Sequence, residues 1–209
     1  MKTRSLAAIL LALSISGLIG NCGNSNDTAT AEDTQYQALP ASSDMTVTWH
    51  EDWNAAMAAA KEAKKPILVH FTADWCVYCK KMKNETYAAP QIKKRFHDGW
   101  VTVLIDTENM KAQGSVYLDA NAKKAMAYLK DGEEGAYDEK SLTNVEMMQF
   151  FGGTGLPTLL FIDKDGVPLQ KIAGFVEKES FAVILDYFQE EAYKKNTNFD
   201  DYRKNHKGI

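Results

Sequence analysis

Apolar positions follow two different periods along the chain, and together they predict a domain that combines helices with strands. Continuous apolar runs at 67–72, 100–106 and 158–162 have the length of buried strands. Over 53–63 and 181–188 the apolar residues recur instead at spacings of three and four, which is typical of amphipathic helices. This mixture of elements indicates the α/β class.

Shorter patterns place further elements and their boundaries. Residues 45–49 alternate between polar and apolar and predict a short strand. Pro90 suits the first turn of a helix. Residues 143–146 (TNVE) match a capping box, which predicts another helix start. Asp and Gly at 163–166 predict a turn between strand 158–162 and a last strand at 167–173.

The segment 107–142 is much longer than an ordinary connection of about 2–6 residues between a strand and a helix. Apolar residues spaced over 118–129 predict a helix inside it, followed by the acidic, glycine-containing stretch 131–139. We interpret 107–142 as an insertion. It either covers an edge of the core or recognises a partner near the active site, because long loops often carry function.

The first residues have the features of an export signal rather than of a folded domain. Lys2 and Arg4 precede the apolar stretch 5–19, which is short for a membrane span and is followed by polar sequence. We therefore expect 1–21 to be a signal peptide and the protein to be exported. Residues 22–43 are mostly small and polar, which predicts a flexible linker.

Cys22 is one of only three cysteines and follows the apolar stretch directly. Residues 18–22 (LIGNC) resemble a bacterial lipobox, so we expect a lipid on Cys22 that anchors the domain to a membrane. The residue before the cysteine, Asn21, departs from the small residues usual there. The alternative is ordinary cleavage after the small residues at 29–31.

Length and charge bound the remaining possibilities. The 209 residues suffice for one domain plus extensions, here 44–192 followed by a polar tail at 193–209 that we expect to fray. Hydrophobic residues make up 45% of the chain, enough for a substantial core. The formal net charge is −4, whereas nucleic-acid-binding proteins usually have a strongly basic face. We therefore expect no nucleic-acid partner. We expect a monomer.

The chemistry of the chain is concentrated in residues 75–80 (WCVYCK), which follow the buried strand 67–72. Cys76 and Cys79 are three residues apart, so a helix starting here places both on one face, within bonding reach. The unpaired N–H groups of a helix N-terminus stabilise a thiolate, which is the species that attacks disulfides. The motif therefore predicts thiol–disulfide exchange, with the disulfide Cys76–Cys79 as the redox group and no other cofactor.

Two other uses of the cysteine pair remain open. The pair could bind a metal ion, but two ligands are too few for a structural zinc site and the sequence has no second CxxC. It could be a structural disulfide, although a bridge that closes so short a loop stabilises little. We expect redox chemistry and no metal.

Residues 73–80 (ADWCVYCK) and 155–158 (GLPT), in this order and spacing, resemble the thioredoxin family. Residues 65–67 (KPI) and 73–77 (ADWCV) most resemble the C-terminal periplasmic domain of the thiol:disulfide interchange reductase DsbD. The resemblance covers about 45–190 without the insertion. It implies a thioredoxin fold, in which helices flank a central mixed sheet, with a helical insertion before the cis-proline half.

The resemblance also implies roles for particular residues. Cys76 corresponds to the exposed attacking thiolate and Cys79 to the resolving thiol. Pro157 corresponds to the cis-proline, which presents the backbone of Leu156 to an extended substrate segment. Trp75 is expected to pack over the active site. Asp74, in the same motif, is expected to be a supporting residue of the site.

Two positions depart from the family pattern. His70 replaces a buried carboxylate that assists proton transfer to the resolving thiol, and Lys83 replaces an acid found in the reductase domains. Both changes should stabilise the Cys76 thiolate and make the disulfide a stronger oxidant than that of thioredoxin. His70 could instead be a core histidine bonded to a backbone carbonyl.

The function implied by the resemblance is reduction of disulfides in proteins of the bacterial periplasm, apocytochrome c among them, with electrons from a membrane donor. The alternatives are a disulfide oxidase or isomerase, which His70 and Lys83 favour, and a binding module in which the cysteines are incidental. Replacing Cys76 by Ser distinguishes these classes, because a binding module would keep its function.

Overall fold

The computed structural model describes residues 45–110, 112–115 and 141–206, and all structural statements concern these residues. They belong to one of the two units into which the chain divides, Leu39–Ile209. The expected signal peptide 1–21, the lipidation site Cys22 and the linker lie outside the described residues. So does the helix predicted over 118–129.

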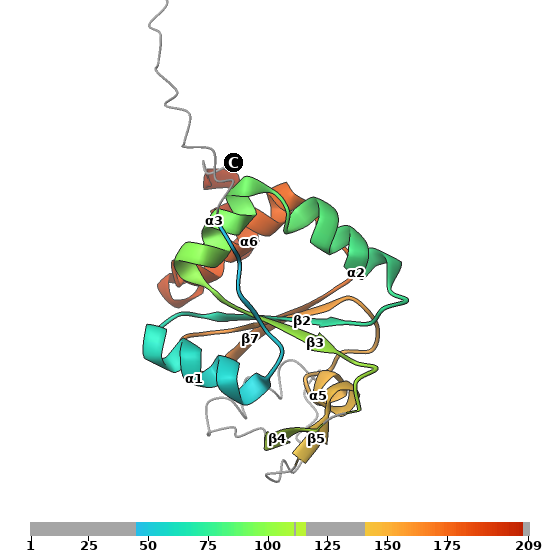
Figure 1. The fold of residues 1–209 in the computed structure, drawn as a ribbon. Coiled ribbons are helices and arrows are strands. Elements are labelled where there is room, and N and C mark those ends of the chain that lie inside the picture. The colour runs from blue at the N-terminus through green and yellow to red at the C-terminus, as the bar shows by residue number, and fades with distance from the viewer. Residues whose placement is uncertain (1–44, 111, 116–140, 207–209) are drawn as a thin grey trace, which may run out of the picture. The chain divides into compact units, whose positions relative to one another are not determined.

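A five-stranded mixed sheet forms the centre of the domain (Figure 1), in the order β1-β3-β2-β6-β7. Strand β2 pairs in parallel with β3 and antiparallel with β6, while β1 joins β3 in parallel and β7 joins β6 antiparallel. The strands are β1 (Trp49–His50), β2 (Ile67–Thr72), β3 (Val101–Asp106), β6 (Thr158–Ile162) and β7 (Pro168–Ala173).

Helices cover both faces of the sheet (Figure 1), and each face has its own apolar cluster. On one face lie α1 (Trp53–Ala63) and α5 (Asn144–Phe150). On the other lie α2 (Val77–Lys81), which continues into a π-helical turn (Met82–Thr86), and the longer α3 and α6. Their bounds are Pro90–Gly99 and Lys178–Gln189.

Local sequence explains where these helices begin and end. Asp52 caps α1 by accepting a hydrogen bond from the backbone N–H of Ala55 at 2.7 Å. Lys64 closes the same helix in the left-handed conformation, two residues before Pro66. The predicted capping box is present at the start of α5, where Thr143 and Glu146 bond each other reciprocally.

Two short strand regions differ from the prediction. The strand expected at 45–49 is reduced to β1, because only Trp49 and His50 pair with β3. The ends of the insertion, β4 (Ala112–Ser115) and β5 (Ser141–Thr143), form an antiparallel pair that we did not predict. Strands of three and four residues are too short to show a periodic signal.

The prediction that the C-terminal tail frays is wrong for the described residues. A 3₁₀ turn (Ala192–Lys195) and helix α7 (Phe199–Asn205) follow α6. The rings of Phe199 and Tyr202 lie 5.3 and 5.2 Å from that of Tyr187 on α6. Phe199 and Tyr202 are three residues apart, so they form a small apolar stripe within a polar sequence.

An ion-pair network also connects the C-terminal segment that contains α7 to the rest of the domain. Asp186 on α6 receives two hydrogen bonds from Arg95, each of 2.7 Å, and lies 2.9 Å from His206 Nε2. This geometry is the bidentate form that makes arginine–carboxylate pairs strong. Asp186 therefore joins α3, α6 and the chain end.

We expect Asp186→Ala to lower the free energy of unfolding by about 1–3 kcal/mol, because it leaves the partly buried Arg95 without its carboxylate. Urea unfolding followed by circular dichroism measures the change. The control is Glu62→Ala on the exposed side of α1, which should stay within about 0.5 kcal/mol. Equal effects of the two variants would contradict the role given to Asp186.

Candidate active site

The two cysteines lie at the point where the chain leaves β2 and enters α2. A tight turn, closed by the Cys76 N–H and the Ala73 carbonyl at 3.1 Å, brings Cys76 to the cap position of the helix. The Cys76 sulfur accepts a hydrogen bond from the Cys79 N–H at 3.1 Å, and the cysteines form a disulfide with Cα atoms 5.2 Å apart. A hydrogen bond of this kind stabilises the charged form of a sulfur.

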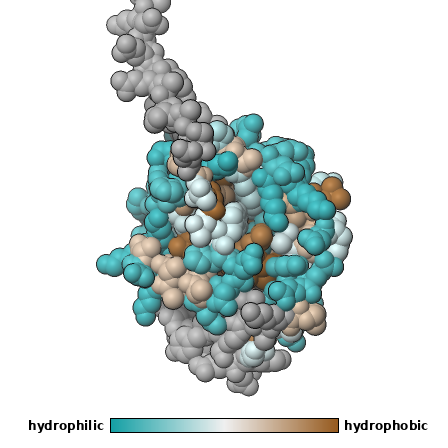
Figure 2. All heavy atoms as spheres, viewed as in Figure 1, coloured by the Kyte–Doolittle hydropathy of each residue, from teal (hydrophilic) through white to brown (hydrophobic). Residues whose placement is uncertain are grey.

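Exposure around the pair differs from the expectation. Cys76 is only 3% exposed and Cys79 only 1%, so the expected exposed position of Cys76 is wrong in this disulfide form. Trp75 is 66% exposed, so most of its side chain is in contact with solvent, and Val77 and Tyr78 are 73% and 59% exposed. The residues next to the buried cysteines in the chain therefore expose large apolar side chains to solvent. On the face seen in Figure 2, a brown apolar area at the right margin lies towards the α2 end.

Pro157 lies at the same end of the sheet as the cysteines. Its peptide bond with Leu156 is cis, as the resemblance implies. The next residue, Thr158, opposes Phe71 near the end of β2, from which the cysteine turn departs. The Pro157 carbonyl accepts a hydrogen bond from Gly174 at 2.8 Å. The side chain of Leu156 packs against the core on the α1 side of the sheet.

Contacts that the sequence did not predict join the cysteine helix to the chain after β7. Two hydrogen bonds join the π turn to the backbone of Val176. The Val176 N–H donates to Met82 Sδ at 3.3 Å, and the Thr86 hydroxyl donates to the Val176 carbonyl at 2.6 Å. The Lys81 ammonium lies 4.1 Å from the centre of the Phe175 ring. A π turn of five residues is too short to differ from an α-helix in its sequence pattern.

The loop after β3 is fastened to the turn before Cys76. Thr107 donates two hydrogen bonds to the Thr72 carbonyl, from its backbone N–H at 2.8 Å and its hydroxyl at 3.0 Å. The Asp74 N–H donates to the Glu108 carboxylate at 3.4 Å. This contact places Glu108 beside the turn that leads to the cysteines, a neighbour that the cysteine motif did not reveal.

His70 lies on β2 and is completely buried. Neither ring nitrogen has a hydrogen-bond partner among the described residues, so the carbonyl partner of the core-histidine alternative is not found there. Its nearest aromatic contact is Tyr87, with ring centres 5.5 Å apart. Burial, and secondly the positive charge of Lys83, lowers the pKa of His70 to about 3. His70 is therefore uncharged at neutral pH.

The described residues contain no group of three or more histidine, cysteine or acidic side chains arranged to hold a metal ion. Within the same residues, no helix has the length and apolar character needed to cross a bilayer.

Residues 53–189 match the thioredoxin-like domain family. The chain belongs to this thioredoxin-like family. The sheet order and flanking helices agree with that assignment, and the predicted fold class is confirmed. A thioredoxin-fold protein from Helicobacter pylori superposes with a TM-score of 0.52 at 16% identity, covering 72% of this chain and 91% of that one.

Sequence comparison within the family confirms the resemblance to DsbD. The chain is 31% identical over 137 residues to the thiol:disulfide interchange protein DsbD of Escherichia coli O6:H1, and 26% identical to that of Cronobacter sakazakii. The matched region is 65% of this chain but only 18% of either relative. The CxxC disulfide in this family context supports general thiol–disulfide oxidoreductase chemistry.

The buried His70 predicts a pH dependence of stability. The unfolded chain has the ordinary histidine pKa of 6.5 and the folded chain about 3, so the unfolded state binds the proton first as the pH falls. The free energy of unfolding should therefore decrease from pH 6.5 towards pH 3, by up to about 1.4 kcal/mol per pH unit, and be independent of this group above pH 6.5.

The variant His70→Leu should remove this part of the slope and raise stability at pH 7.5 by about 1–3 kcal/mol, because two unpartnered polar atoms leave the core. Urea unfolding at a series of pH values tests both effects. The half-buried His50 on β1, replaced by Leu, is the control and should leave the slope unchanged. If His70→Leu keeps the wild-type slope, the proposed burial of a neutral imidazole is wrong.

Proposed function

We propose that this protein reduces disulfides in exported polypeptides through Cys76 and Cys79. The observation that carries the proposal is the cysteine pair at the start of α2, with a sulfur facing a helix N–H, at the same sheet end as the cis peptide of Pro157. The similarity to DsbD supports reduction as the direction.

In the proposed reaction, the Cys76 thiolate attacks one sulfur of the substrate disulfide. The substrate S–S bond breaks, one substrate sulfur leaves as a thiolate, and the other becomes bonded to Cys76. Cys79 then loses its proton and attacks the Cys76 sulfur, which releases the second substrate thiolate and forms the Cys76–Cys79 disulfide. Two electrons pass from the dithiol to the substrate.

His70 is too weak a base to accept the Cys79 proton at neutral pH, because its pKa is lowered to about 3, so we propose that it acts as a neutral supporting residue. It lies on the strand that leads into the cysteine helix, it is uncharged at neutral pH, and its ring nitrogens have no partner in the described part of the chain. A buried polar side chain without partners destabilises the fold, so its presence favours a functional explanation. Lys83 and Trp75 remain supporting residues in this proposal.

Continued reduction requires a dithiol donor, which we propose is a membrane protein that exchanges with the Cys76–Cys79 disulfide. We further propose that the domain works in the periplasm as a monomer, held at the membrane by a lipid on Cys22 and the 22–43 linker. The signal-like residues 1–21 support export.

A second candidate function is disulfide oxidation or isomerisation, and the charges around the site favour it. A neutral His70 and a cationic Lys83 replace two acidic positions, so less negative charge opposes the Cys76 thiolate. A more stable thiolate raises the reduction potential. We therefore expect a potential above the value of about −270 mV typical of thioredoxin. Equilibration with glutathione measures it, and a value at or below that figure would contradict the expectation.

Substitution of each cysteine tests the exchange proposal. Cys76→Ser should abolish reduction of a disulfide-bonded peptide by dithiothreitol-regenerated protein, leaving the uncatalysed rate. Cys79→Ser should instead accumulate a mixed disulfide between Cys76 and the peptide, visible by mass spectrometry after acid quenching. A Cys76→Ser protein that keeps its full rate would support the binding-module alternative.

The variant Lys83→Glu tests the charge argument. It should lower the reduction potential of the pair by about 30 mV or more, since that shift corresponds to about 1.4 kcal/mol of changed thiolate stability. The matched control is Lys61→Glu on α1, across the sheet, where the same charge change should leave the potential within error. Equal shifts in both variants would indicate only a general effect of net charge.

A further inference from the structure

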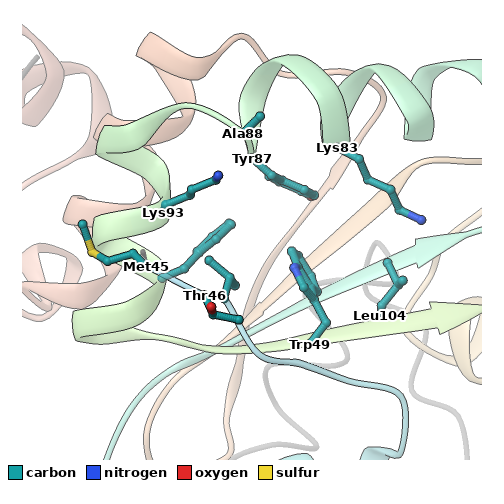
Figure 3. Close-up of a pocket in the computed structure, with 10 residues that line it drawn as sticks. Met45, Thr46, Trp49, Lys83, Tyr87, Ala88, Lys93 and Leu104 are labelled. Carbon is teal, nitrogen blue, oxygen red and sulfur yellow. The ribbon is translucent and has the colours of Figure 1, made fainter. Parts of the chain in front are cut away.

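An open cavity of about 620 Å³ lies on the sheet face that carries α2 and α3, and neither cysteine lines it. Three aromatic side chains, Trp49, Tyr87 and Phe96, line it together with Leu104 of β3 (Figure 3). The rings of Tyr87 and Phe96 both pack on Trp49, at 5.2 and 5.6 Å, so the wall is mutually supported. A cavity of this volume with apolar walls is of the size that accommodates small organic molecules.

Two lysines give the cavity its charge. Figure 3 shows Lys93 and Lys83 on opposite sides of the Tyr87 ring. Neither has an ion-pair partner in the part of the chain that the structure describes, whereas the nearby Lys81 and Lys94 are paired with Glu85 and Asp98. The cavity therefore carries local positive charge, although the net charge of the chain is −4.

We propose that this cavity binds a small organic anion with an aromatic or otherwise apolar body. The apolar body would lie against Trp49, Tyr87 and Phe96, and the acidic group would pair with either Lys83 or Lys93. Charge complementarity selects an anion, and the apolar wall selects against small hydrated anions such as phosphate. The proposal does not depend on the direction of disulfide exchange.

Lys83 connects this cavity with the redox site. It belongs to the π turn that continues the cysteine helix, and its charge acts on the buried His70. An anion bound at Lys83 would partly neutralise that charge. By thermodynamic reciprocity, the ligand affinity should then differ between the disulfide and dithiol forms of the protein.

The test uses two fluorescent probes, 8-anilinonaphthalene-1-sulfonate and its uncharged relative N-phenyl-1-naphthylamine, with the native protein at pH 7.5. We expect saturable binding of one sulfonate probe per molecule, at least fivefold tighter than the neutral probe. In the double variant Lys83→Met/Lys93→Met this preference should disappear, because the aromatic wall remains while the charges are lost. A fivefold difference in dissociation constant corresponds to about 1 kcal/mol, which is the size expected for an exposed ion pair.

The matched control is Lys61→Met/Lys195→Met, which removes the same charge from exposed positions outside the cavity and should keep the preference. Trp75→Ala should keep it too. The proposal is overturned if binding does not saturate, if both probes bind equally, if the control pair has the same effect, or if Trp75→Ala abolishes binding. That last outcome would place the probe on the apolar surface beside the cysteines.

Discussion

Strand β2 is hydrogen-bonded along both edges, to β3 and to β6, and all six of its residues are buried. A strand held in this way cannot slip by one residue without moving every apolar side chain to the wrong face. Its register therefore fixes where the chain emerges at Ala73 and where the helix cap at Cys76 forms. The same register brings Thr158, and with it the cis peptide before it, to the end of β2.

That rigid placement also holds His70 away from water. An imidazole with no partner in the described part of the core destabilises the folded state, whereas an aliphatic residue at the same place would stabilise it. Sites where local rules of folding are broken are often those that carry function. The surroundings of His70 follow this pattern, since its neighbours Tyr87 and Lys83 belong to the segment that continues the cysteine helix.

The sequence predicted the parts of the fold that have long periodic patterns or specific caps. Strands 67–72 and 158–162 and the helix 53–63 were predicted at their observed bounds, because buried apolar runs and a regular helical spacing are strong local signals. The helix start at Cys76 was also predicted. The β4–β5 pair was not, because its strands are too short to show a period.

The surroundings of the cysteines were harder to predict, because they depend on contacts between segments far apart in the chain. The contact of Asp74 with Glu108 and the π-turn contacts with Val176 join residues more than 30 positions apart. The low exposure of Cys76 likewise results from tertiary packing, which no local pattern reports. The cysteines themselves could be found because their chemistry lies in a motif of four residues.

The pairing of β4 with β5 has a consequence for how this chain tolerates change. It brings Ser115 and Ser141 opposite each other, so the stretch between them begins and ends at one place on the domain. The entropy of closing such a loop grows only slowly with its length. A change in chain length between these two serines therefore costs the β4–β5 pair little additional closure entropy. The pair is thus a suitable place at which to graft a new module onto the domain.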